Sequence, residues 1–308
     1  MMIEVNSEAP DHQIVSPSDS GRGQCPSWIE RLPYLGAGLG FRRPLARQIY
    51  RHAAEVDFLE IISEHYLDPL PFDRRELGEL ARRFPLVPHG LNLSPGTAEP
   101  ADEDYLRRVA RLVEETRAPW WSDHLAMTRA GRIDIGHLSP LLLTEETLGI
   151  VCENINRARS VVGAPLIIEN IAYTLQLPGA EMSEAEFLSA VLERTDSGLL
   201  LDLMNLHANA HNHGFDPEEF LSAIPLERVV QVHIIGGHYD RDILVDSHSA
   251  RTPDPVWEML KLVARRTEVK AVLLEWDEQL PDFAVIRDEL ARAREILRSA
   301  AVTHTATA

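Results

Sequence analysis

Side chains that commonly bind metals recur at the ends of short apolar segments in this chain. Seven of eight such segments end in a histidine or a carboxylate, as in LVPHG, LIIEN and VLLEW. Imidazole and carboxylate groups are ligands of iron, manganese and zinc. The pattern indicates a metal site if the segments converge in space. The residues are Glu64, His65, His89, Asp123, His124, Glu169, Asn170, Asp202, Asn205, His233 and Glu275, with Asp246 and His248 in the motif VDSH after the seventh segment.

The order of elements predicts that these ends do converge. Short apolar segments alternate with longer segments of helical period, which is typical of repeated βα units with a parallel sheet. Several segments are apolar throughout, as expected for strands covered on both faces. About 250 residues is the usual size of a (β/α)8 barrel, so 308 residues predict one TIM barrel of the α/β class. The predicted strands are Tyr34–Phe41, Asp57–Ile62, Leu86–Leu93, Trp120–Met127, Leu166–Ala172, Gly198–Leu206, Val229–Gly236 and Ala271–Asp277.

A barrel would gather several carboxylates at one face, because all C-terminal strand ends of this fold meet there. Two carboxylates about 4 Å apart repel by roughly 4 kcal/mol at an effective dielectric constant of about 20. The chain has only two lysines, Lys261 and Lys270, to compensate this charge. Two or more bound metal ions are the simplest solution. Mixed imidazole and carboxylate ligands favour iron, manganese or zinc over magnesium or calcium.

Composition predicts how the rest of the chain is organised. Residues 1–30 are rich in Ser, Pro, Asp and Gly, so we expect a flexible N-terminal leader, one catalytic domain at 31–300 and a C-terminal tail at 301–308. The sequence shows neither a signal peptide nor an apolar run long enough for a membrane span. Its two cysteines cannot form a disulfide framework, so we expect a cytoplasmic protein. The formal charge of −18 argues against a nucleic-acid partner.

Some residues near these motifs are assigned other roles. The segment NLHANAHNHGFD, which contains His207, His211 and His213, is predicted to be a polar loop, with metal ligation by one of these histidines as the less favoured alternative. Glu60 in DFLEII is predicted to be a buried partner of a metal ligand. The pair Trp120–Trp121 is assigned to packing.

Ten motifs in order resemble those of the DUF692/UPF0276 family, the multinuclear non-heme iron-dependent oxidative enzymes (MNIO) to which the methanobactin-biosynthesis oxidase belongs. The resemblance runs from about Tyr34 to Phe283. It implies a TIM-barrel oxidoreductase with two or three iron ions, mixed Fe2+/Fe3+, and O2 as co-substrate. It also implies RiPP biosynthesis, in which a residue of a ribosomal precursor peptide, often cysteine, is modified with the help of a small partner protein. The motifs are GAGLGFR, LEIISEHY, PHGLNLS, SDHLA, IIENIAY, LLLDLMN, NHGFDP, VHIIGGH, VDSH and LLEWD.

The resemblance also implies roles for individual residues. Glu169, as the carboxylate bridging two metals, is expected to be catalytic together with His65 and Asp246. His124, Asn170 and Asn205 are expected to support the cofactor. Many relatives have Asn at the position of His65, and Met204 replaces an Asn of the common DxNN pattern. The implied metal ligands are His65, His89, Asp123, Glu169, Asp202, His233, Asp246, His248 and Glu275.

Two other classes of function stay open at this point. A divalent-metal sugar isomerase or an endonuclease IV-like phosphodiesterase would share the barrel and similar ligands. Many such isomerases use a lysine at a strand end, and neither Lys261 nor Lys270 lies at one. A barrel that stores metal or binds a peptide without turnover is the non-enzymatic alternative.

Overall fold

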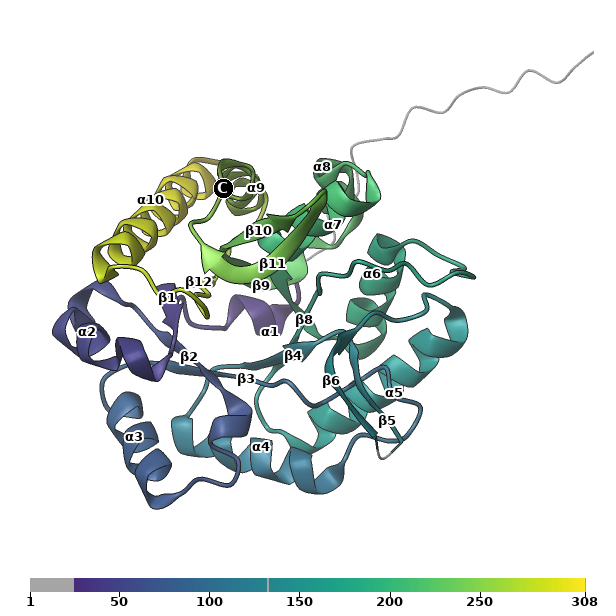
Figure 1. The fold of residues 1–308 in the computed structure, drawn as a ribbon, viewed down its shortest axis with the longest axis horizontal. Coiled ribbons are helices and arrows are strands. Elements are labelled where there is room, and N and C mark those ends of the chain that lie inside the picture. The colour runs from purple at the N-terminus through teal and green to yellow at the C-terminus, as the bar shows by residue number, and fades with distance from the viewer. Residues whose placement is uncertain (1–24, 132, 308) are drawn as a thin grey trace, which may run out of the picture.

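The computed structural model describes residues 25–131 and 133–307. Its centre is a closed barrel of eight parallel strands with helices around it (Figure 1). Each barrel strand lies within a predicted segment, so the (β/α)8 TIM barrel is confirmed. The barrel strands, in chain order, are β1 (Gly36–Gly40), β2 (Leu59–Ile62), β3 (Leu86–His89), β4 (Trp121–His124), β7 (Leu166–Glu169), β8 (Gly198–Asp202), β9 (Val229–Ile234) and β12 (Ala271–Leu274).

The helices begin where the sequence provides caps. The Thr144 hydroxyl accepts a hydrogen bond from the Thr147 N–H at the start of α5, and Ser183 and Glu186 form a capping box at the start of α6. The helices are α1 (Ser27–Glu30), α2 (Ala46–Arg51), α3 (Pro71–Ala81), α4 (Glu103–Thr116), α5 (Glu145–Val161), α6 (Glu184–Thr195), α7 (Leu203–His213), α8 (Pro217–Ala223), α9 (Asp254–Arg266) and α10 (Phe283–Thr307), with short 3-10 turns η1 (Arg43–Leu45), η2 (Ala53–Glu55), η3 (Ser63–His65) and η4 (Leu226–Arg228).

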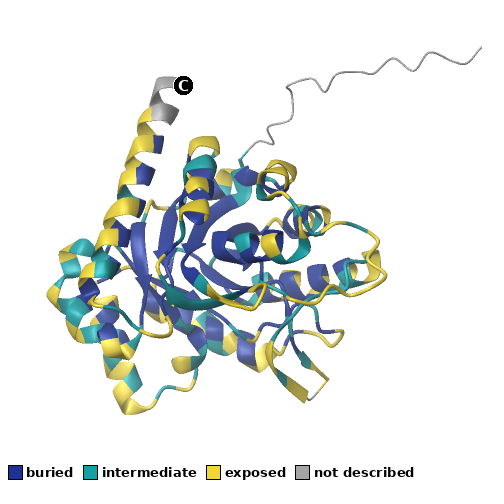
Figure 2. Ribbon diagram, turned by 45° about the horizontal axis from the view of Figure 1, so that its top comes forward, coloured by how far each residue is buried: buried dark blue, intermediate teal, exposed yellow. Residues whose placement is uncertain are grey.

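The barrel interior is packed with large apolar side chains near its N-terminal end. Phe58, Trp120 and Leu200 belong to this inner cluster, and Ile29 of α1 packs against them with 2% of its surface exposed. A larger outer core fills the space between the strands and the helices, whose solvent faces are exposed (Figure 2). The N-terminal end of the barrel is therefore closed, and functional chemistry is left to the other end.

The chain ends differ from the predicted leader and tail. Residues 1–24 of the leader lie outside the described residues, but 27–30 form α1 because Ile29 finds a buried apolar site. At the other end, α10 continues to Thr307, into the segment predicted as a tail. None of the helices formed by the described residues combines the length and the apolarity needed to cross a membrane.

Two antiparallel hairpins interrupt the βα repeat and were not predicted. The first joins β5 (Met127–Ala130) to β6 (Ile133–Ser139) after β4. The second joins β10 (Gly236–Asp240) to β11 (Ile243–Ala250) after β9. The second hairpin contains VDSH, which the sequence placed in a loop.

The polar segment after β8 is a helix and not the predicted loop. The Asp202 carboxylate caps the first turn of α7 by accepting the Asn205 N–H at 2.6 Å. Gly214, with φ of +71°, ends the helix in the left-handed conformation that glycine adopts without strain. β8 consequently ends at Asp202 and does not continue to Leu206.

Two glycines allow a paired test of this packing. A Cβ at Gly38 of β1 would overlap the Phe58 ring, whereas a Cβ at Gly149, on the exposed face of α5, would meet no atom within 4 Å. We expect Gly38→Ala to lower the free energy of unfolding by about 1–3 kcal/mol through overpacking. We expect Gly149→Ala to raise it by roughly 0.5–1 kcal/mol, because alanine favours a helix interior. Urea denaturation of both variants measures the two effects, and equal changes would contradict this packing.

Candidate metal centre

Three groups of potential ligands lie at the C-terminal mouth of the barrel. Within each group, one ligand atom per residue lies within 4.8 Å of the others. Glu169 belongs to the first two groups and Glu275 to the last two, so the groups form one connected cluster. The first group is His89, His124 and Glu169; the second is Glu169, Asp202, His233 and Glu275; the third is His248, Glu275 and Asp277.

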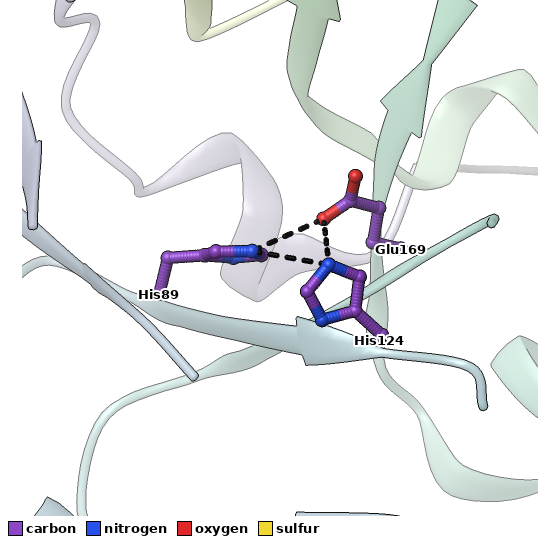
Figure 3. Close-up of side chains that lie close together, drawn as sticks. All are labelled: His89, His124 and Glu169. Atoms are coloured by element: carbon purple, nitrogen blue, oxygen red, sulfur yellow. Dashed lines mark hydrogen bonds and ion pairs between the residues drawn. The ribbon is translucent and has the colours of Figure 1, made fainter. Parts of the chain in front are cut away.

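The first group brings two imidazoles and one carboxylate together from β3, β4 and β7 (Figure 3). The Nε2 atoms of His89 and His124 are 3.3 Å apart, and each lies 3.5 Å from Oε2 of Glu169. The Ser122 hydroxyl lies 2.8 Å from Nδ1 of His89 and can hold the ring so that Nε2 faces the group. Burial lowers the pKa of His89, which favours the neutral, metal-binding form.

The second group is centred on His233 of β9. Its Nδ1 lies 3.0 Å from Glu275 Oε2, 3.6 Å from Glu169 Oε1 and 3.9 Å from Asp202 Oδ2. Burial alone would lower the pKa of His233, but the surrounding carboxylates raise it well above its usual value. On the other side of the ring, Glu60 Oε2 lies 3.2 Å from Nε2. Glu60 is therefore buried against His233, and its role as partner of a metal ligand stays a prediction.

The third group joins the β10–β11 hairpin to the end of β12. His248 Nδ1 lies 2.9 Å from Asp277 Oδ2 and 3.8 Å from Glu275 Oε2, and its Nε2 lies 2.7 Å from Asp246 Oδ2. His248 has φ of +50°, an uncommon conformation for a residue other than glycine. The Arg42 guanidinium, at the end of β1, pairs with Asp277 and lies 3.5 Å from Glu275. Asp277 was not predicted, although its spacing of two residues from Glu275 in LLEWD is a usable signal.

Several buried atoms of this cluster have no hydrogen-bond partner. A buried polar group without a partner costs about 1–3 kcal/mol, and more when it is charged. Cations would satisfy these lone pairs, and the nitrogen and oxygen donors fit iron, manganese or zinc. The arrangement is therefore chemically suited to binding metal ions. The unpartnered oxygen atoms are Oε2 of Glu169, Oδ2 of Asp202, Oδ1 of Asn205 and Oδ1 of Asp246.

Asn170 and Asn205 fix the position of Asp202. The Asn170 amide donates to the Asp202 carbonyl at 3.0 Å, and its oxygen accepts the Asp202 N–H at 2.9 Å. The Asn205 amide donates to the Asn170 carbonyl at 3.0 Å. Both asparagines thus brace the ends of β7 and β8, and the unpartnered oxygen of Asn205 remains available to a cation.

The structure does not bring Asp123 to the ligand groups. Asp123 and His124 are adjacent on β4, and successive strand residues point to opposite faces, so His124 faces inward in its place. The Asp123 carboxylate instead accepts hydrogen bonds from the Leu93 N–H at 3.1 Å and the Tyr105 hydroxyl at 3.3 Å. Burial raises the pKa of Asp123 to about 7. We therefore correct its expected role from ligand to buried support of β4.

The other predicted residues lie outside the three ligand groups, either beside the cavity or away from it. His65 ends the 3-10 turn η3, is exposed and belongs to none of the three groups, so the expected ligand and catalytic role is not supported. Asp246 is outside these groups but lines the same cavity and contacts His248. His211 and His213 bind the carbonyls of Asp242 and Tyr173, and no histidine of α7 belongs to a ligand group.

The cluster opens into a cavity of about 900 Å³. All residues of the ligand groups except Asp202 and His233 line it. The hairpin residues Met127 and Val245 complete the wall together with Tyr173, Leu175 and Leu177 of the segment after β7. A cavity of this size is at the upper end of the range for small-molecule sites.

Fold and site together define a TIM-barrel protein whose C-terminal face carries groups of side chains able to hold metal ions. Solved structures of this shape include a D-tagatose 3-epimerase-like protein, with a TM-score of 0.55 and 19% identity over 86% of this chain and 98% of that one. Endonuclease IV from Thermus thermophilus has a TM-score of 0.50 and 17% identity over 86% of this chain and 98% of that one. At such identities the likeness shows the fold alone.

The chain belongs to the family described as RiPP precursor modification enzyme MbnB/TglH/ChrH, which matches residues 36–298. UPF0276 proteins are also similar. The relative from Rhizorhabdus wittichii is 38% identical over 84% of this chain and 94% of its own length. The relative from Caulobacter vibrioides is 36% identical over 85% of this chain and 95% of its own length. These matches confirm the resemblance drawn from the motifs, and family and fold indicate an enzyme.

The sequence favoured His65 as a metal ligand and the geometry favours His124, and substitution of each residue tests this difference. We expect His124→Ala to lower metal affinity by at least about 10-fold to 100-fold, the loss typical of an outer-shell partner, because it removes a ligand atom from the first group. We expect His65→Ala to leave metal content unchanged, because His65 is exposed and outside the groups. Elemental analysis of both purified variants decides the matter. Metal loss in the His65 variant alone would restore the prediction made from the sequence.

Asp202 lends itself to a test of charge repulsion in the metal-free protein. Burial, and then the charges of Asp246 and Glu169, raise the pKa of Asp202 well above its usual value. The protonated side chain therefore contributes its full stability below the pKa of the unfolded chain. This stability is lost as the pH rises through the pKa of the folded protein. We expect Asp202→Asn, which keeps the helix cap, to stabilise the metal-free protein at pH 8 by roughly 1 kcal/mol or more and to weaken metal binding. Urea unfolding at pH 5 and pH 8 after chelation measures the gain, with the exposed Asp288→Asn as control. A gain that shrinks at higher pH would contradict this account.

Proposed function

We propose that this protein is a multinuclear non-heme iron-dependent oxidase that uses O2 to modify a residue, in the first instance cysteine, of a ribosomally synthesised precursor peptide. The observation that carries the proposal is the connected cluster of three ligand groups, which contains buried oxygen atoms without a hydrogen-bond partner. The family description, which names precursor modification, supports a peptide substrate. As part of the proposal, a small partner protein presents the peptide, and the reaction takes place in the cytoplasm.

The proposed ligands divide among three positions. His89, His124 and Glu169 would hold one ion, and Glu169 would be shared with a second ion held by Asp202, His233 and Glu275. Glu275 would be shared in turn with a third position formed by His248 and Asp277, beside Asp246. When bound, the iron ions would supply the redox chemistry and open coordination positions for substrate and O2.

The surrounding residues have the task of holding these ligands in place. Ser122 and Glu60 contact the outer nitrogens of His89 and His233, respectively, and fix the orientation of each ring. Arg42 pairs with Asp277 and lies near Glu275, so it partly neutralises the third group. Leu175 and Leu177, both solvent-exposed, add apolar side chains to the cavity wall.

The lysine positions weigh against lysine-dependent isomerase chemistry. Lys261 lies on α9 and pairs with Glu258. Lys270 is buried just before β12, at the opposite end of the barrel, and pairs with Glu268 at 3.0 Å. Neither residue lines the metal cavity.

The proposal is tested by metal analysis and Mössbauer spectroscopy on protein purified without oxygen. We expect two or three iron ions per chain, partly as a coupled pair, and O2 consumption when a cysteine-containing candidate peptide from a neighbouring open reading frame is added. Glu169→Gln should lose the coupled signal, because one carboxylate is shared by two positions. Glu193→Gln, an exposed change on α6, serves as the control. Zinc or manganese alone, with no O2 uptake after iron reconstitution, would refute the oxidase.

A further inference from the structure

A second cavity, of about 530 Å³, adjoins the metal cavity. It lies between the segment that follows β7, the start of α6, and α8. Apolar side chains such as Leu143, Ile171, Met182, Phe187 and Phe220 form most of its wall. Pro140, Tyr173, Leu175 and Leu177 line both cavities, so the two share a wall.

The charged groups of this second cavity are all acidic. Glu184, Asp216 and Glu219 line it, and no lysine, arginine or histidine among the described residues does. Asp216 caps α8 by accepting the Glu218 N–H at 2.8 Å. Glu184 accepts one hydrogen bond, from the Tyr173 hydroxyl at 2.8 Å, and no basic side chain in the described part of the chain pairs with it. A carboxylate set among apolar groups without a cation is costly unless a ligand supplies one.

The shared wall is held rigidly. The Tyr173 N–H donates to the Asn209 side chain at 3.0 Å, and the Tyr173 carbonyl accepts from His213 Nε2 at 2.9 Å. The Tyr173 ring stacks on the His213 ring with centroids 4.7 Å apart. Because Tyr173 is fixed on one side by α7 and bonded to Glu184 on the other, the carboxylate is held toward the cavity in advance of binding.

We propose that this second cavity binds the side chain of an arginine or lysine in the peptide substrate. The aliphatic stem would lie along the apolar wall, and the cationic end would pair with Glu184, as long basic side chains do at apolar surfaces. The net charge of −18 would favour the approach of such a peptide. The identity of the occupant as a peptide rests on the proposed function. Because the two cavities share the wall that contains Tyr173, the basic residue would lie a short distance along the peptide from the residue that is modified.

The partly buried position of Glu184 agrees with this assignment. Desolvation raises the pKa of Glu184 to about 7, against the opposing effect of the Tyr173 hydrogen bond. A guanidinium or ammonium group in the cavity would restore the ionised form and gain a desolvated ion pair. Asp216 and Glu219 lie at exposed positions of the lining, where they would attract the same cation.

Binding of short blocked peptides tests the proposal without turnover. The probes are acetyl-Gly-Arg-Gly-amide, its lysine counterpart, and analogues with citrulline or norleucine at the central position. Saturation-transfer NMR on the purified full-length chain measures the dissociation constants at low salt. We expect the arginine and lysine peptides to bind about tenfold or more tightly than the citrulline and norleucine peptides.

Variants of residues that line the second cavity test whether the peptides bind there. Glu184→Gln should abolish the preference for the cation, whereas Glu193→Gln, on the exposed face of the same helix, should keep it. Ala223→Trp should block all binding, because Ala223 lines the cavity from the end of α8. Equal binding of arginine and citrulline peptides, a preference for norleucine, or no saturable binding up to about 20 mM would each overturn the proposal. These experiments need no metal, so their failure leaves the iron analysis intact, and failure of the iron analysis leaves the binding data intact.

Discussion

Mutual repulsion among buried carboxylates is the constraint on which the mouth of this barrel depends. Glu60, Glu169, Asp202 and Glu275 are all less than 10% exposed and surround a single imidazole, His233. In the metal-free protein the charge is balanced by protons: the pKa of His233 is raised, as is that of Asp202, while His248 and His233 help to hold the pKa of Glu275 low despite its burial. Metal ions must displace such protons, so metal affinity and proton release are linked.

The barrel tolerates this crowding of carboxylates because the apolar packing that stabilises it lies in another part of its interior. Large apolar side chains fill its N-terminal half, where Ile29 closes the end, and the packing there does not depend on the acidic groups. Between the two regions, Gln231 accepts a hydrogen bond from the Trp120 indole at 2.9 Å and donates one to Glu60 at 2.6 Å. One polar side chain thus connects the apolar layer to the charged layer and leaves neither unsatisfied.

The fold and most of the site could be predicted because both follow from strand order. Residues at the ends of parallel strands must meet, so His89, Glu169, Asp202, His233 and Glu275 could be identified without coordinates. The sequence could not decide which of two adjacent residues at a strand end points inward, because a shift of one residue turns every side chain to the other face.

Asp123 and His124 are neighbours on β4, and the strand register turns only His124 toward the ligand groups. The turn after β2 makes a similar choice: His65 is exposed, whereas Glu64 accepts a hydrogen bond from the Leu91 N–H. The hairpins were missed because their strands are polar and lie outside the βα repeat. The helix α7 was missed because its capping signals, Asp202 and Gly214, were interpreted as strand-end chemistry and a loop.

The β10–β11 hairpin acquires a further property from the residues it contributes. His248 and Asp277 meet across 29 positions of chain, with α9 and β12 between them. An ion held jointly by the hairpin and by the end of β12 would act as a reversible cross-link that closes this loop, comparable in its effect on chain entropy to a disulfide. Without metal the hairpin is already linked to this strand end, because the His248 carbonyl accepts the N–H groups of Asp277 and Glu278 at 3.0 and 3.2 Å. A bound ion would strengthen this existing link, so the stability of the barrel mouth would depend on its metal content.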